Sequence, residues 1–303
     1  MNIIKWFRLR KRNHHFPLHL EQPPTPFFIV GSGRCGTTLL RRELSNVASV
    51  HIPPETFALP DAIAAFKNSS ATDWDELVEQ VLAKFDYHLE FDYFELPSLR
   101  PLAYQLKQLP VKQQCLEKII TGIYHYHADF HGQAYEVWGD KTPMHVWHMN
   151  AIRKVYPNVK FIHLIRDGVD VVNSYLKSRD GYSIEQAAQR WNGSVQAFEN
   201  FAKRHPDNCH VVRYEALVAK PDEVIKQLCE FLAINYDLSK IDQRENVTKM
   251  GDVTMLKHHE NVFNSINTSS VGKGRKLLEL EDREILHKLI GTELKKYGYQ
   301  SVL

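Results

Sequence analysis

Residues 27–38 read FFIVGSGRCGTT, an apolar run that breaks into glycines, one basic residue and two threonines. Four consecutive apolar residues predict a short strand that is buried on both faces. A helix is expected to begin near Thr37, because Leu40, Leu44 and Val47 then fall on one side of it. A glycine loop between a strand and a helix is the setting in which backbone N–H groups bind an anion. The stretch therefore predicts an anion-binding loop at the end of a buried strand.

The rest of the chain continues this alternation of apolar runs and helical patterns. VKFIHLI (159–165) and CHVVRY (209–214) are typical of buried strands, and helical periodicity follows each of them. Strands that alternate with helices predict an α/β fold, a parallel β-sheet flanked by helices of the P-loop NTPase-like kind. Residues 57–135 are mainly helical in pattern, and we expect a helical substrate-binding insertion there.

The bulk composition limits the number of domains and the kinds of partner. We expect a single domain over residues 25–303, preceded by a basic tail over residues 1–24. The net charge of +2 argues against a nucleic-acid partner, so any anion site must be local. No apolar run reaches the roughly 18 residues that a membrane span requires. Residues 1–16 are basic and aromatic, which is typical of a solvated tail or of a weak contact with an anionic membrane surface.

The four cysteines are scattered along the chain, and none of them forms a C-x-x-C pair. This pattern disfavours a disulfide framework or a zinc site and fits a reducing compartment. We therefore expect a cytoplasmic protein, peripheral at a membrane if the basic tail docks there.

The glycine loop departs from that of nucleotide triphosphatases. Such a loop reads G-x-x-x-x-G-K-[ST], whereas here Thr37 stands in place of the lysine and Arg34 lies three positions earlier. Gly33 and Gly36 allow close backbone approach, and Thr37 and Thr38 can donate hydroxyl hydrogen bonds. An ordinary strand-to-helix turn with glycines for packing is the alternative that this motif alone leaves open.

A second polar motif follows the second predicted strand. FIHLIRDGVDVVNS (161–174) places Arg166 at the end of the strand and Ser174 eight residues further, within the next helix. An arginine there can bind a phosphate through two donors, and the serine adds a third. The alternative is a structural ion pair between Arg166 and Asp170.

Together the two motifs resemble those of the sulfotransferase superfamily, enzymes that use 3′-phosphoadenosine 5′-phosphosulfate (PAPS). GSGRCGTT resembles the family's 5′-phosphosulfate loop, commonly R-S-G-T-T, and RDGVDVVNS resembles its 3′-phosphate motif. WGDKTP (138–143), VVRYEALVAKPDEVIKQLCEFL (211–232) and SSVGKGRK (269–276) also resemble family segments, in the same order. The resemblance covers about residues 27–298 and is closest to the branch of tyrosylprotein and bacterial sulfotransferases. It implies sulfuryl transfer from PAPS to a hydroxyl or amine acceptor.

The resemblance also implies which residues bind the nucleotide, with Tyr214 against the adenine and the C-terminal glycine-and-basic loop closing over it. The implied set is Gly33, Arg34, Cys35, Gly36, Thr37, Thr38, Arg166, Ser174, Tyr214, Gly272, Lys273 and Arg275.

Two positions depart from the family pattern. Cys35 stands where the loop commonly has serine, and a thiol is a weaker hydrogen-bond donor. Its thiol is either inert and buried or open to an oxidation that would block the loop. Gly168 and Val169 replace the common Pro-Arg or Gly-Arg, so one basic side chain near the 3′-phosphate is absent.

The expected chemistry is mostly positioning and charge stabilisation, by analogy with phosphoryl transfer. Arg34 and Lys141 match basic positions of the family motifs and are expected to neutralise the leaving phosphate. Glu55, in HIPPET (51–56), is expected to accept the acceptor's proton, because the tyrosylprotein-type branch carries a glutamate in a similar segment. His145 is the alternative base, and capping of a following helix is the structural alternative for Glu55.

Other features leave the acceptor open between a glycan, a small molecule and a peptide tyrosine. DYHLEFDYFE (86–95) either contributes aromatic side chains to an acceptor site or forms a half-buried helix. His127 and His131 have the spacing of a metal pair but lack a third ligand, and His258–His259 is a similar weak case. We expect no metal.

Two rival functions remain at this point. A P-loop kinase or other NTP-using enzyme would need the loop lysine and a carboxylate for Mg²⁺, and neither is evident. A non-catalytic nucleotide-binding interaction module could use the same fold, since fold alone does not fix activity.

Overall fold

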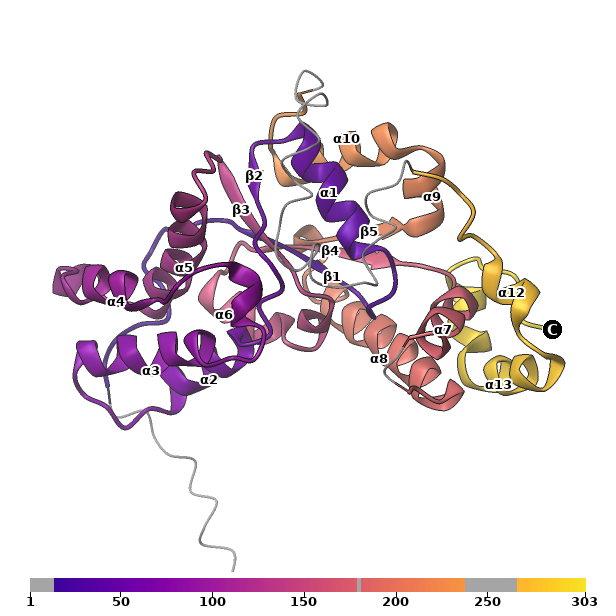
Figure 1. The fold of residues 1–303 in the computed structure, drawn as a ribbon, viewed down its shortest axis with the longest axis horizontal. Helices are drawn as coiled ribbons and strands as arrows, with labels where there is room; N and C mark the ends of the chain where they lie inside the picture. Colours follow the sequence, from indigo (N-terminus) through magenta and orange to yellow (C-terminus); the bar gives the residue numbers. More distant parts are fainter. Residues whose placement is uncertain (1–13, 179–180, 238–265) are drawn as a thin grey trace, which may run out of the picture.

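The computed structural model describes residues 14–178, 181–237 and 266–303, and a parallel sheet lies at its centre (Figure 1). In this described part the sheet has five strands in the order β2-β3-β1-β4-β5, and every neighbouring pair is parallel. The strands are β1 (Phe27–Val30), β2 (Val50–His51), β3 (Val137–Lys141), β4 (Lys160–Ile165) and β5 (Cys209–Arg213). The predicted class, a parallel sheet flanked by helices, is confirmed.

Helices lie on both sides of the sheet, with α1 and α10 on one side and α8 on the other (Figure 1). The helices are α1 (Thr37–Val47), α2 (Leu59–Asn68), α3 (Trp74–Asp86), α4 (Arg100–Lys107), α5 (Leu116–Phe130), α6 (Met149–Val155), α7 (Gly168–Leu176), α8 (Ile184–Ala202), α9 (Tyr214–Ala219), α10 (Pro221–Leu232), α12 (Lys273–Leu277) and α13 (Leu280–Lys296). Among the described residues, no helix combines the length and the apolar character needed to cross a membrane.

The central strand β1 is buried on both faces, as its four apolar residues predict. Phe28 and Val30 belong to one core cluster, whereas Phe27 and Ile29 belong to the other. This division follows from the alternation of side chains along a strand. Strand β1 thereby anchors the loop that follows it in two hydrophobic cores.

Strand β3 was not assigned from the sequence, because glycine, aspartate and lysine are depleted in strands. The two-residue strand β2 was not assigned either. Gly139 is required there, since a Cβ atom would lie 2.3 Å from the ring of Phe27 on the neighbouring strand. Overpacking of that kind costs about 1–3 kcal/mol. The WGDKTP segment is therefore a buried strand whose end delivers Lys141 to the edge of the sheet.

The predicted helical insertion is present as α2 to α5, at the left in Figure 1. Its core is continuous with one face of the sheet, because Trp74 and Tyr124 share a cluster with Phe28 and Phe161. The acidic aromatic stretch 86–95 contains a short 3₁₀ helix, Phe91–Phe94, with both terminal phenylalanines buried. Residues 1–13 and the pair His258–His259 lie outside the described residues, so the predictions for them stay predictions.

Three buried histidines predict that acid destabilises the fold. His51, His145 and His163 are each 1% exposed, and burial lowers their pKa from 6.5 to about 4, 4 and 3, respectively. Below about pH 6.5 the unfolded chain binds protons on these side chains that the folded protein does not bind. The free energy of unfolding should therefore fall between about pH 6.5 and about pH 4, by up to about 1.4 kcal/mol per pH unit for each histidine.

Urea unfolding at about pH 7 and about pH 5 measures this loss of stability. Replacement of His163 with phenylalanine, which can keep the stacking on Phe198, should make the loss smaller, and the exposed position His287→Gln serves as the control. Equal stability of the wild-type protein at both pH values would contradict the prediction.

Candidate active site

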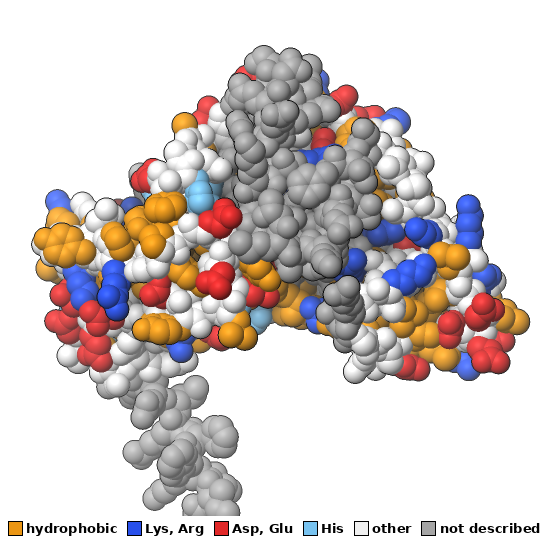
Figure 2. Space-filling view, in the orientation of Figure 1, with side chains coloured by type: hydrophobic (Ala, Val, Ile, Leu, Met, Phe, Trp, Pro, Cys, Tyr) orange, Lys and Arg blue, Asp and Glu red, His pale blue; other side chains and the backbone are white. Residues whose placement is uncertain are grey.

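A cleft of about 410 Å³ opens at the carboxyl edge of the sheet, where the chain leaves β1, β3 and β4. Lys and Arg side chains gather on the side of the molecule where α9 and α12 lie (Figure 2). Of the residues predicted from sequence, the cleft lining includes Gly33, Arg34, Gly36, Thr37, Thr38, Glu55, Arg166, Ser174 and Tyr214.

The loop after β1 has the backbone shape that its glycines predict. Gly33 and Gly36 have φ angles of +76° and +94°, and Arg34 between them has a φ angle of +55°. Only glycine adopts such angles readily. A Cβ atom at Gly36 would also lie 2.6 Å from the ring of Tyr214. The loop thus allows the backbone to turn sharply at α1 while Tyr214 packs directly against it.

The two anion motifs meet in the cleft. The Arg34 side chain donates a hydrogen bond from Nε to Ser174 Oγ at 3.2 Å, and Arg166 donates to the carbonyl oxygen of Arg34 at 3.3 Å. The Arg166 guanidinium also lies 4.5 Å from the centre of the Tyr214 ring, a cation–π contact. Arg166 Nη2 lies 3.7 Å from Asp170 Oδ2. The ion pair between Arg166 and Asp170 is therefore present in addition to the contacts of Arg166 with Arg34 and Tyr214.

Arg166 has one donor that no other group in the described structure satisfies. Its Nε is buried and has no hydrogen-bond partner in the described structure. Such an orphaned donor on a charged group favours an anionic partner. The side chain is 10% exposed, and it lines the cleft.

Glu55 and Lys141 form an ion pair at the edge of the cleft. Glu55 lines the cleft with 21% of its side chain exposed, whereas the Lys141 side chain is fully buried. Lys141 ends β3, which lies beside β1 with Lys141 opposite Ile29. The carboxylate of Glu55 therefore lies between the ammonium group and the cleft.

The alternative base, His145, lies elsewhere. It is 1% exposed, it is absent from the cleft lining, and its Nε2 is 3.0 Å from Thr56 Oγ1. Burial lowers the pKa of this imidazole to about 4. Its position favours Glu55 over His145 as the group that meets an acceptor.

Cys35 points below the loop rather than into the cleft. Its sulfur lies 2.9 Å from Ser32 Oγ, its side chain belongs to a core cluster, and burial raises the pKa of the thiol. The whole residue is 1% exposed and is absent from the cleft lining. The geometry agrees with the inert buried thiol of the two alternatives, and the expected contact of Cys35 with a nucleotide stays a prediction.

The C-terminal loop approaches the cleft through Ser270, which lines it and accepts a 2.6 Å hydrogen bond from Arg166. Gly272 donates its N–H to the carboxylate of Asp170 at 2.8 Å. Arg275 pairs with Asp167 at 2.7 Å, and Lys273 is exposed. The expected contacts of Gly272, Lys273 and Arg275 with a nucleotide stay predictions, because these residues are absent from the cleft lining.

Several residues that line the cleft were not predicted from the sequence. Arg190 of α8 enters the cleft beside Tyr182 and donates from Nε to Tyr175 Oη at 3.1 Å. Phe57 also lines the cleft and stacks on His88, with ring centroids 6.3 Å apart. The 86–95 stretch therefore reaches the rim of the cleft. No local signal separates these residues from helix-surface or core residues, since only the tertiary fold turns them inward.

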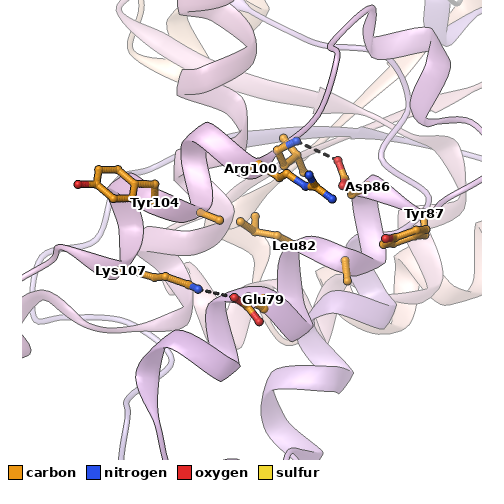
Figure 3. A pocket seen from close by; sticks show the side chains of 10 residues that line it. Glu79, Leu82, Asp86, Tyr87, Arg100, Tyr104 and Lys107 are labelled. Carbon is orange, nitrogen blue, oxygen red and sulfur yellow. Dashed lines mark hydrogen bonds and ion pairs between the residues drawn. The ribbon is translucent and has the colours of Figure 1, made fainter.

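A second cavity, of about 500 Å³, lies between α3 and α4 of the insertion (Figure 3). Glu79 and Lys107 form an ion pair across it, and Tyr87 and Tyr104 are 84% and 71% exposed. Its lining contains no glycine loop. The cleft at the sheet edge is therefore the candidate active site.

The histidine pair of the sequence analysis lies in a different setting. His127 Nδ1 is 3.1 Å from His51 Nε2, and His131 Nε2 is 3.0 Å from the carbonyl oxygen of Phe94. Over the residues that the structure describes, no group of three or more His, Cys, Asp or Glu side chains is arranged to hold a metal ion.

Comparison with protein families matches residues 26–237 to the sulfotransferase family. Protein-tyrosine sulfotransferase 1 of Danio rerio is 22% identical over 281 residues, which cover 90% of this chain and 71% of that protein. Protein-tyrosine sulfotransferase of Drosophila melanogaster is 23% identical over 256 residues, which cover 81% of this chain and 46% of that protein.

Solved structures share the fold. The sulfotransferase domain from the curacin biosynthetic pathway has a TM-score of 0.56 at 22% identity, covering 91% of this chain and 98% of that domain. The sulfotransferase domain of the Synechococcus PCC 7002 olefin synthase has a TM-score of 0.57 at 21% identity, covering 94% and 97%.

The contact of Gly36 with Tyr214 predicts a selective loss of ligand binding. Gly36→Ala should weaken the binding of adenosine 3′,5′-bisphosphate, the nucleotide that remains when PAPS has lost its sulfuryl group, about tenfold or more, because the new methyl group displaces Tyr214 from the cleft. Gly132→Ala is the matched control, since Gly132 also has a positive φ but no atom within 4 Å of its Cβ position. Calorimetric titration measures both affinities, and equal affinities of the two variants would refute the prediction.

Proposed function

Because the chain belongs to the sulfotransferase family, its reaction is PAPS-dependent sulfuryl transfer to a hydroxyl-bearing acceptor, and we propose that this acceptor is a peptide tyrosine. The names of the protein-tyrosine sulfotransferases to which it is similar support a phenolic acceptor. Glycans and small-molecule hydroxyls are the other acceptors that the assay must include.

The roles proposed for the residues of the cleft rest on one observation. The glycine loop, Arg166, Ser174 and Glu55 come from separate parts of the chain and line one cleft. That convergence provides backbone and arginine donors for two phosphate groups and a carboxylate beside them. The P-loop kinase is not favoured, because Thr37 still stands where its lysine would be.

The residues of the cleft fit the two ends of PAPS. The loop amides with Thr37 and Thr38 would hold the 5′-phosphosulfate at the N-terminus of α1. Arg166 and Ser174, which both line the cleft, would hold the 3′-phosphate. Tyr214, packed against Gly36 and facing the cleft, would contact the adenine.

The sulfuryl transfer needs a base for one proton and positive charge beside one leaving group. When bound, PAPS supplies an activated sulfuryl group. Glu55 accepts the proton of the acceptor hydroxyl while the acceptor oxygen bonds to sulfur and the bond from sulfur to the bridging phosphate oxygen breaks. Arg34, which lines the cleft, offsets the negative charge that develops on the phosphate. Protonation of Glu55 leaves the charge of its ion-pair partner Lys141 uncompensated, and this charge then adds to the stabilisation. The products are a sulfate ester and adenosine 3′,5′-bisphosphate.

The cellular location remains a proposal of its own. We retain the cytoplasm, with a weak peripheral membrane contact through the basic tail, as the location to test. The four cysteines are all free in the structure, which is compatible with that proposal.

If Glu55 is the base, its replacement should lower the turnover rate without weakening the binding of the nucleotide. Glu55→Gln should lower kcat by about a hundredfold or more, because the amide accepts no proton, while the affinity for adenosine 3′,5′-bisphosphate stays within about twofold. The assay follows transfer from radiolabelled PAPS to a panel of tyrosine peptides, glycans and small phenols.

Glu79→Gln, at an ion-paired position on the insertion, is the matched control and should keep wild-type turnover. Near-wild-type turnover of Glu55→Gln would eliminate Glu55 as the base. Absence of transfer by the wild-type protein across the whole panel, despite nucleotide binding, would favour a non-catalytic module.

A further inference from the structure

Glu55 and Thr56 lie across the end of β3 and contact three consecutive residues there. Glu55 pairs with Lys141, the Thr56 hydroxyl donates to the carboxylate of Asp140, and the Thr56 N–H donates to Thr142 Oγ1 at 2.8 Å. Side chains of an extended chain alternate between two faces, and the chain stays extended through Thr142. Lys141 can therefore meet Glu55 on one face while Asp140 and Thr142 meet Thr56 on the other.

The Thr56 hydroxyl is the middle of a buried chain of hydrogen bonds. A hydroxyl has one proton, and here it goes to Asp140 Oδ2. The contact of 3.0 Å between Thr56 Oγ1 and His145 Nε2 must then use the proton of the imidazole. Tyr124 Oη donates to the same Asp140 oxygen at 2.8 Å. All four side chains are at most 1% exposed.

This buried chain includes polar atoms that make no hydrogen bond. Asp140 Oδ1 and His145 Nδ1 are buried without a hydrogen-bond partner in the described structure, although Asp140 Oδ1 lies 3.6 Å from His145 Nε2. Each such atom costs about 1–3 kcal/mol, and apolar side chains of similar volume are often at least as stabilising. Buried polar networks nevertheless fix one conformation of the groups that they connect. The group next to this network is Glu55, the proposed base.

We propose that Thr56, Asp140 and His145 are positioning residues, which act on the reaction by fixing the carboxylate of Glu55 at the cleft edge. This inference rests on the proposed role of Glu55. His145 then contributes as a hydrogen-bond donor to Thr56 and not as the base. A misplacement of about 1 Å at a reacting group can lower a rate about a hundredfold. A network that holds Glu55 in place can therefore affect kcat without touching the substrate.

The test removes the hydroxyl and keeps the shape of the side chain. Thr56→Val should lower kcat about tenfold or more, with the affinity for adenosine 3′,5′-bisphosphate unchanged within about twofold. Thr56→Ser keeps the hydroxyl and should restore most of kcat. Asp140→Leu is the second variant, because it removes the oxygen that accepts the hydroxyl protons of Thr56 and Tyr124, and it should lower kcat in the same way.

Thr121→Val is the matched control. Its hydroxyl is also buried and bonded to a carboxylate, Glu117 Oε1 at 2.9 Å, and to Tyr156 Oη at 3.0 Å. It should lower the melting temperature as Thr56→Val does and leave kcat unchanged. A fall of kcat in Thr121→Val similar to that in Thr56→Val would attribute the effect to lost stability and overturn the proposal.

A double-mutant cycle separates positioning from an independent structural role. If Thr56 acts through Glu55, then Thr56→Val should not lower further the residual rate of Glu55→Gln. Losses of rate that multiply in the double variant would overturn the proposal.

A structural readout keeps the inference testable even where no acceptor is found and the proposed function fails. Crystal structures of the wild-type protein and of Thr56→Val with adenosine 3′,5′-bisphosphate should show the pair of Glu55 with Lys141 broken only in the variant. The loop from Gly33 to Thr38 should be the same in both. An unchanged Glu55–Lys141 pair in Thr56→Val would contradict the positioning role, whatever the activity.

Discussion

The parallel pairing of β1 with β3 on one side and β4 on the other is the interaction on which the cleft depends. It aligns the carboxyl ends of three strands, so that the glycine loop, Lys141 and Arg166 reach the same edge of the sheet. The side chains of β1 are at most 1% exposed, and burial of each large apolar side chain contributes about 1.5–3 kcal/mol. The candidate anion site is therefore anchored by a strand whose side chains are all buried.

Sequence reasoning located the parts of the site whose chemistry is local. The glycine loop could be predicted because a strand, a turn with positive φ angles and a helix follow one another, and Arg166 and Ser174 because they flank the next strand-to-helix turn. Strand β3 could not, because its Gly139 and Asp140 are poor strand formers that only Phe27 and the buried network accommodate.

The direction of a side chain was harder to predict than the position of its residue. Cys35 lies in the loop but its side chain belongs to the core, and His145 follows the WGDKTP segment but contacts Thr56 rather than the cleft. Arg190 and Phe57 reach the cleft from a helix and from the insertion, through contacts between distant parts of the chain. Such orientations depend on packing that no spacing in the sequence encodes. The same packing turns Glu55 to the cleft and Thr56 away from it.

A crystal structure with adenosine 3′,5′-bisphosphate tests most directly the central claim, that one cleft at the sheet edge binds both ends of the nucleotide. The account predicts the 5′-phosphate on the amides from Gly33 to Thr38, the 3′-phosphate on Arg166 and Ser174, and the adenine against Tyr214. It also predicts Glu55 beside the 5′-phosphate with its carboxylate facing the open part of the cleft. A nucleotide bound with its phosphates exchanged, or in the cavity between α3 and α4, would contradict it.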